Sequence, residues 1–152
     1  MWATKQSRKL QRESRSQQRI GDAYLQVLEY AEAEGQYFSA SKFNWDLTTW
    51  DEWRVHTRRR EVRPEAHLRA RSAALIAAFA TPSVKQAHAN WLAVLEAADQ
   101  AEDTLKWNAG EGYNPDELLP EHELVHFNDA VKAEREARQA MAALMSGELS
   151  TA

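Results

Sequence analysis

The chain has 152 residues, a formal net charge of −4 and no cysteine. This length suffices for one domain with its own core, and the lack of cysteine excludes disulfides and cysteine-ligated zinc. No stretch reaches the roughly 20 apolar residues of a membrane span, and no apolar run near Met1 is typical of a signal peptide, so we expect a cytoplasmic protein. With 5 Gly and 4 Pro, the composition favours an all-α fold.

The charge is unevenly distributed along the chain. Residues 1–72 contain 14 Lys and Arg against 10 Asp and Glu, whereas residues 73–152 contain 5 against 13. The two parts therefore carry net charges of +4 and −8. Such asymmetry holds segments together or orients a partner, and the overall sign argues against a general nucleic-acid binder.

The first predicted element is a long helix that begins near Lys5. Residues 1–19 are basic and have no core-facing stripe, which predicts an extension that projects from the fold and either meets a partner helix or an anionic surface, or frays. Beyond it a buried face is predicted from helical spacing, formed by Ile20, Tyr24, Val27, Leu28 and Ala31. The helix either ends at Gly35 or continues through it to about residue 42.

Residues 37–63 form the segment predicted to be irregular, in which aromatic residues precede arginines. Thr49 and Glu52 are spaced as a capping box for one short helix. Trp45, Trp50 and Trp53 are candidates for a ligand cage or partner anchor, or else fill the open side of a bundle. The run that includes Arg58, Arg59 and Arg60 is a candidate nucleic-acid patch, although the charge balance favours a solvated face paired with the acidic later helices.

Three further helices are predicted over residues 64–80, 82–107 and 120–146. Pro64 suits the first turn of one, Thr81 and Pro82 suit the N-cap and first turn of the next, and Gly147 suits the end of the last. Between the last two, one helical turn is predicted over residues 115–119, with Asn114 as its N-cap. The residues predicted to face inward are Leu68, Leu75, Ile76, Phe79; then Val84, His88, Trp91, Leu95, Ala98, Leu105; and finally Leu124, Phe127, Val131, Met141, Met145.

One short motif has the spacing of zinc hydrolases, His-Glu-x-x-His, in which two histidines bind the metal and the glutamate activates water. Here these residues are His122, Glu123 and His126. At about 100° per residue, both histidines lie more than 90° from the apolar face of their helix. The acidic residues also suit the first turn of any helix.

The surroundings of this motif differ from the extended signature of zinc proteases. Pro120 and Glu121 precede the first histidine, and Asn128 stands where that family has a hydrophobic residue. Glu134 and Glu136, the nearby downstream ligand candidates, lie too far along the same helix to complete one site. His88 is a further ligand candidate, although its apolar stripe favours a core histidine. We therefore expect no metal and no catalytic residue.

Part of the chain resembles a loose set of helical actinobacterial proteins of no known function. The likeness lies in residues 19–28, 75–79, 82–84 and 87–95, where those proteins show an R-x-x-x-A-Y-x-x-x-L helix followed by a short apolar helix and a tight turn. The resemblance implies an all-helical hairpin or bundle, often behind membrane-spanning helices in other members. It implies no activity and no site residues.

Together these patterns predict a single all-helical domain over residues 1–152, an antiparallel bundle of about four helices with a projecting N-terminal helix. The expected function is a non-enzymatic interaction or assembly module that self-associates or binds a protein through the projecting helix or the Trp-rich segment. One alternative is a zinc-dependent hydrolase that uses Glu123 as base and His122 and His126 as ligands. Another is a weak binder of nucleic acid or an anionic surface through its arginines, with at most peripheral membrane contact.

Overall fold

The computed structural model describes residues 2–39, 49–58, 63–110 and 114–151. Over these residues the fold is all-α, as the sequence predicts, and contains five helices and no strand. The helices are α1 (Trp2–Ser39), α2 (Trp50–Arg58), α3 (Ala66–Phe79), α4 (Pro82–Gly110) and α5 (Glu121–Ser150). The predicted bundle of about four helices does not count the nine-residue α2. The spacing of Thr49 and Glu52 nevertheless predicts a short helix at this place.

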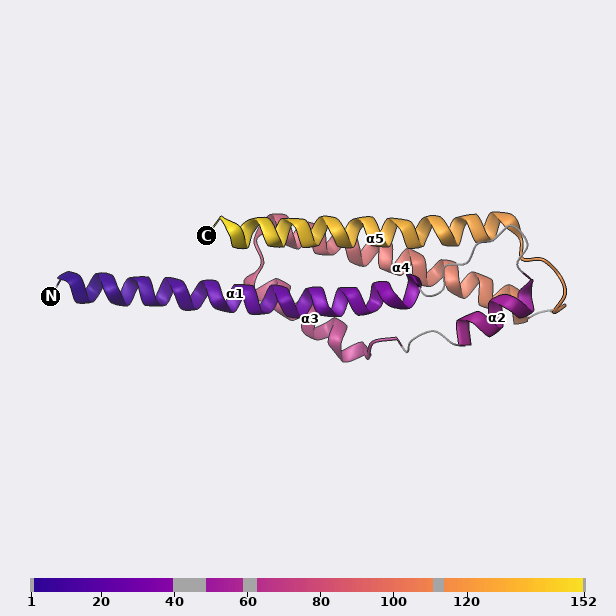
Figure 1. The fold of residues 1–152 in the computed structure, drawn as a ribbon, viewed down its shortest axis with the longest axis horizontal. Helices are drawn as coiled ribbons and strands as arrows, with labels where there is room; N and C mark the ends of the chain where they lie inside the picture. Colours follow the sequence, from indigo (N-terminus) through magenta and orange to yellow (C-terminus); the bar gives the residue numbers. More distant parts are fainter. Residues whose placement is uncertain (1, 40–48, 59–62, 111–113, 152) are drawn as a thin grey trace.

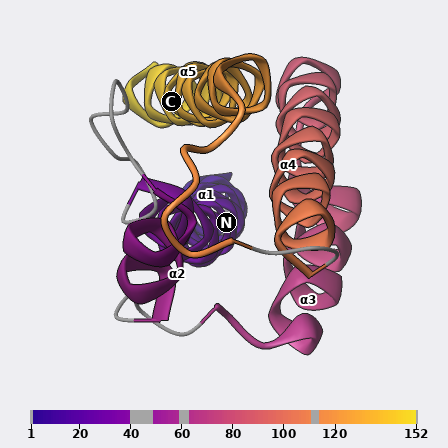
Figure 2. The same cartoon turned by 90° about the vertical axis from the view of Figure 1, so that its right-hand side faces the viewer.

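The three long helices run along the long axis of the molecule (Figure 1). α4 and α5 are antiparallel, α1 runs antiparallel to α5, and α3 lies beside α1. Figure 2, which looks along the axis from the α2 end, shows α1, α4 and α5 surrounding a common centre. Buried side chains from all five helices form one hydrophobic cluster there.

The predicted apolar stripes of α4 and α5 are confirmed. All six predicted residues of α4, from Val84 to Leu105, and all five of α5, from Leu124 to Met145, are buried. In α3 only Ile76 is fully buried, whereas Leu68 and Leu75 are partly covered. The prediction for Phe79 is wrong, because it is the last residue of α3 and 36% of it remains exposed where the chain turns into α4.

α1 continues through Gly35, and this position faces a buried arginine. A Cβ atom at Gly35 would collide with the guanidinium group of Arg138 on α5. That guanidinium donates to the buried carboxylate of Glu134 (Nε to Oε1, 2.9 Å) and pairs with Glu32 of α1 at 2.7 Å. The missing side chain of the glycine therefore makes room for a charge that joins α1 to α5.

Two predicted helix starts are confirmed by backbone donors. Thr81 Oγ1 accepts a hydrogen bond from the Val84 amide, and Thr49 Oγ1 accepts one from the Glu52 amide, both at 3.3 Å. These contacts satisfy amides that have no partner inside the first turn of a helix.

Other predicted boundaries need correction. α3 begins at Ala66, so Pro64 precedes the helix rather than opening it. Residues 115–119 form no helical turn: a hydrogen-bonded turn covers residues 114–117, and Leu118 forms an isolated bridge with Thr49. α5 continues past Gly147 to Ser150, and the Gly147 carbonyl accepts hydrogen bonds from the hydroxyls of Ser150 and Thr151.

A projecting helix and the candidate sites around it

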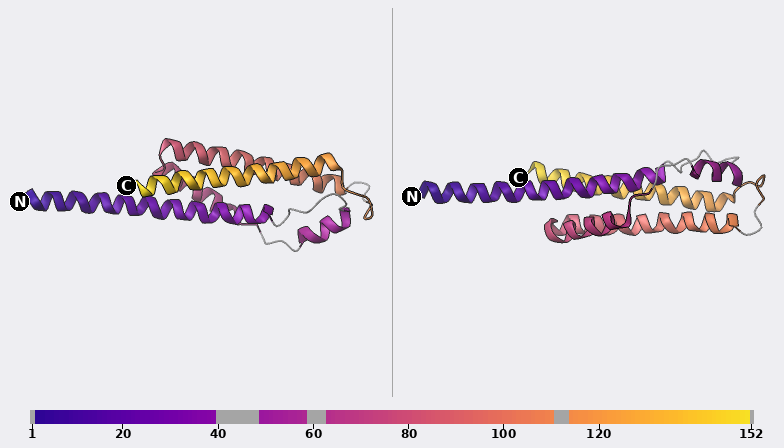
Figure 3. Two further views of the ribbon diagram at one scale, coloured as in Figure 1. Left: turned by 45° about the horizontal axis from the view of Figure 1, so that its top comes forward. Right: turned by 90° about the horizontal axis from the view of Figure 1, so that it is seen from below.

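The N-terminal half of α1 extends beyond the ends of the other helices (Figures 1 and 3). Every residue from 3 to 19 is exposed, and burial begins only at Ile20. Helical structure in this projecting segment is propagated from the packed part of α1, since the segment itself has no buried face.

Two faces of the projecting segment differ in chemistry. At about 100° per residue, all its basic side chains fall on one side of the helix, which we call the basic stripe. Its members are Lys5, Arg8, Lys9, Arg12, Arg15 and Arg19. Roughly opposite lies a neutral seam made of Ala3, Ser7, Leu10 and Ser14. With Gln6 and Gln11, the seam lines a shallow groove of about 400 Å³.

The neutral seam could have been found in the sequence but was missed. Its residues are spaced by four, three and four positions, which is the a/d spacing of a helix-pairing seam. The signal is weak because three of the four side chains are small and only Leu10, which is 61% exposed, is a large aliphatic residue. A search for large apolar stripes therefore passes over it.

The His-Glu-x-x-His residues lie at the start of α5, where the two histidines are on its outer side and Glu123 faces α4. The His122 side chain is 84% exposed, and His126 is exposed as well. Glu123 accepts a hydrogen bond from the side-chain amide of Asn108 on α4, which ties this carboxylate to the neighbouring helix. Over the described part of the chain, no group of three or more His, Cys, Asp or Glu side chains is arranged to hold a metal.

His88 does not join these histidines. The hydrogen bond between Asn108 and Glu123 shows that the motif lies beside Asn108 of α4. His88 lies 20 residues before Asn108 on that helix. At 1.5 Å per residue the separation is about 30 Å, far beyond any shared coordination sphere. His88 is 6% exposed and packs against Trp91 with ring centroids 6.0 Å apart. Its burial lowers its pKa below the usual 6.5.

The tryptophan candidates have separate outcomes. Trp50 and Trp53 are 5% and 3% exposed and pack edge to face in the core, with ring centroids 6.3 Å apart. This burial favours the alternative that they fill the open side of the bundle, because their rings offer little area to a partner. Trp45, Arg59 and Arg60 and the side chain of Arg58 lie outside the described residues.

A buried ionic cluster fastens the chain before α3 to the bundle. Glu34 on α1 is 2% exposed and accepts hydrogen bonds from Arg63 (2.9 Å) and from the hydroxyl of Tyr30 (2.8 Å). Arg63 also pairs with Asp99 of α4, and its guanidinium lies 5.2 Å from the ring centre of Tyr37. Sequence reasoning missed this cluster because its partners are 29 and 36 residues apart.

Tyr30 belongs to the same cluster. Burial, together with its bond to Glu34, raises the pKa of Tyr30 to about 12, although a hydrogen bond from Arg69 acts in the opposite direction. The hydroxyl therefore stays protonated at physiological pH and donates to Glu34. With all of these groups paired to one another, the cluster has the arrangement of a structural joint rather than of a catalytic site.

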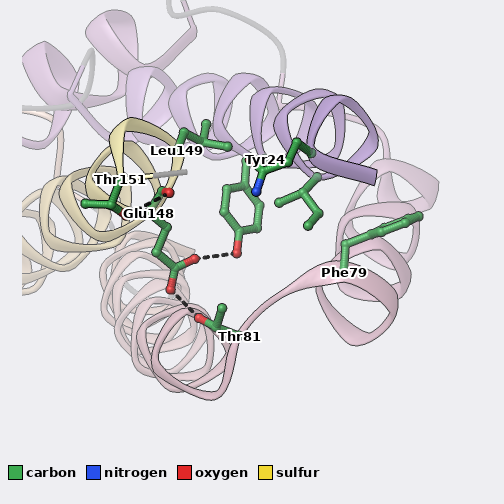
Figure 4. Close-up of a pocket in the computed structure, with 8 residues that line it drawn as sticks. Tyr24, Phe79, Thr81, Glu148, Leu149 and Thr151 are labelled. Atoms are coloured by element: carbon green, nitrogen blue, oxygen red, sulfur yellow. Dashed lines mark hydrogen bonds between the residues drawn. The ribbon is translucent and has the colours of Figure 1, made fainter. Parts of the chain in front are cut away.

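A small pocket of about 280 Å³ lies where the projecting segment leaves the bundle (Figure 4). Its walls come from α1, the α3–α4 junction and the end of α5, and include Ile20, Phe79 and Leu149. The hydroxyls of Tyr24 and Thr81 both donate to Glu148, with the Tyr24 bond at 2.7 Å. These two hydrogen bonds join the end of α5 to α1 and to the residue that precedes α4.

Comparison with known proteins adds no relationship. No family model, curated protein or solved structure matches the chain. Within the described residues, no helix is long and apolar enough to cross a membrane.

Proposed function

We propose that this protein is a non-enzymatic helical module that associates with a second copy of itself through the projecting segment of α1. The observation that carries the proposal is the exposure of all 17 residues from 3 to 19, which continue a helix whose remainder is packed in the core. An isolated helix of this length is marginal in water, so a partner that covers it adds stability.

Two features favour the projecting segment over the Trp-rich segment as the contact surface. Leu10 is 61% exposed and lines the shallow groove of the neutral seam. Trp50 and Trp53, in contrast, are already covered by the bundle. The hydrolase alternative is less well supported, because the two histidines of its motif are exposed and no third ligand stands near them among the described residues.

Replacing Leu10 by arginine tests this function. The full chain is expected to show a mass that rises with concentration from one chain toward two, measured by light scattering after size exclusion. Leu10→Arg removes the seam's large apolar side chain and adds a charge, so this variant is expected to remain a monomer over the same range.

Leu25→Arg is the matched control, since Leu25 is a 57% exposed leucine of the same helix that lies beside the bundle. This variant is expected to associate as the unaltered chain does. A strict monomer for the unaltered chain at high concentration contradicts the proposed self-association. Equal loss in the two variants would mean that the effect is not specific to the projecting segment.

A further inference from the structure

The neutral seam is continuous with the interface between α1 and α5. Positions spaced alternately by four and three residues run along the whole of α1: Ala3, Ser7, Leu10, Ser14, Gln17, Gly21, Tyr24, Leu28, Ala31, Gly35 and Phe38. Gly35 faces Arg138 of α5, and a Cβ at Gly21 would lie 3.8 Å from Leu149 near the end of α5. From Tyr24 onward the line is buried or partly buried, whereas from Gln17 toward the N-terminus it is exposed. The part of this line that lies beside α5 is thus covered, and the part beyond the end of α5 is exposed.

We propose that the uncovered part of the seam is occupied by the same segment of a second copy, packed antiparallel, with Ala3 opposite Ser14 and Ser7 opposite Leu10. This inference rests on the proposed self-association and specifies its surface, direction and register. The partner helix would run in the direction of α5 and begin near the place where α5 ends (Figure 1). The positive N-terminal end of its dipole would then face the negative C-terminal end of α5, which is favourable.

The register follows from the space along the seam. Leu149 already occupies the position opposite Gly21, so an incoming helix cannot pair its Ala3 there. A shift of one heptad toward the N-terminus avoids this side chain and keeps seam positions facing one another. In that register Leu10 of each copy meets the small side chain of Ser7 of the other. The contact is isologous, as expected for a two-fold dimer.

The charges of the projecting segment favour contact through the neutral seam over contact through the basic stripe. Six basic residues against Glu13 give the segment a net charge of +5, so two such helices repel if their basic stripes meet. With the neutral seams facing each other, the two basic stripes point outward. They then lie about 20 Å apart, twice the diameter of one helix, which exceeds the Debye length of about 8 Å at physiological ionic strength.

Paired cysteines test the direction and register, since the natural chain contains none. The full-length Ala3→Cys/Ser14→Cys variant is expected to form a covalent dimer under mild oxidation. Within one helix the two positions are 11 residues, about 16 Å, apart, which is too far for an internal disulfide. Ala3→Cys/Ser16→Cys is the collision control, because Ser16 lies on the side of the basic stripe, and it is expected to crosslink far less. Efficient crosslinking of Ser14→Cys alone would indicate parallel pairing and overturn the inference.

A second pair of variants tests the surface without covalent chemistry. Ser14→Arg places a long charged side chain on the seam and is expected to abolish the dimer in sedimentation equilibrium. Ser16→Arg makes the same change two residues later on the opposite face and is expected to leave the dimer intact. A dimer that survives Ser14→Arg, with no crosslink in the first cysteine variant, overturns the seam pairing but leaves self-association standing. A monomer in every variant and in the unaltered chain overturns both.

Discussion

His88 shows how a single buried polar residue affects this fold. It occupies a core position of α4, its Nε2 atom has no hydrogen-bond partner among the described residues, and burial lowers its pKa from 6.5. A folded-state pKa below the unfolded value means that the unfolded chain takes up a proton first on acidification. The contribution of His88 to stability is therefore present above pH 6.5 and is lost as the pH falls from there through the folded-state pKa.

His88→Leu is expected to reduce this loss. Leucine has no ionisable group and needs no hydrogen-bond partner in the core, so the free energy of unfolding should fall less between pH 7.5 and pH 5.5, about one unit either side of the ordinary histidine pKa. At neutral pH the variant should be more stable than the unaltered chain by about 1 kcal/mol, because an unsatisfied buried polar atom is removed. Urea unfolding at both pH values measures the difference, with the exposed His122→Leu as control. Equal losses in His88→Leu and the unaltered chain would contradict this role.

The glycines of the helices illustrate how element-level contacts decide a substitution. Gly21 and Gly147 have room for a methyl group, since the nearest atom to a Cβ at Gly21 is 3.8 Å away and none lies within 4 Å at Gly147. At Gly35 the same methyl group would collide with Arg138, whose side chain is 9% exposed and paired with Glu134 and Glu32. The three positions are alike in helix propensity but differ in what lies opposite.

Alanine substitutions at these glycines should therefore differ in sign. Gly21→Ala and Gly147→Ala are each expected to raise the free energy of unfolding by about 0.5–1 kcal/mol through helix propensity. Gly35→Ala is expected to lower it by about 1–3 kcal/mol, because displacing Arg138 leaves the buried Glu134 without its partner and outweighs the propensity gain. Urea unfolding of the three variants checks this order. Stabilisation by Gly35→Ala would show that Arg138 finds another position at little cost.

The elements were predictable from the sequence to the extent that they depend on local pattern. The stripes of α4 and α5 follow from helical periodicity, and the capping roles of Thr49 and Thr81 follow from spacing within one turn. Contacts between distant parts were not predictable. From the sequence alone Gly35 could end the helix, and only the structure shows Arg138 opposite it. The pairing of Arg63 with Asp99 joins residues that are 36 positions apart in the sequence. The neutral seam was overlooked because small side chains give a weak hydrophobic signal.

The whole molecule combines a bundle with its own core and a helix that extends beyond it (Figure 3). Trp50 and Trp53 are buried because they belong to the bundle. The segment of the first 19 residues has no apolar stripe because it extends beyond the bundle and has no core to face. The proposed dimer covers the uncharged side of the extension and leaves its basic stripes outward. Salt then affects association through repulsion between two copies and not through attraction to an acidic surface.

The most direct measurement is sedimentation equilibrium of the full chain at low and at high salt. Our account predicts a monomer–dimer equilibrium that shifts toward the dimer as salt is added, because screening weakens the repulsion between two segments of charge +5. A chain that stays monomeric in both conditions would contradict the proposed self-association. A dimer that dissociates on addition of salt would contradict pairing through the neutral seam and indicate that the basic stripe contacts an acidic surface of the other copy.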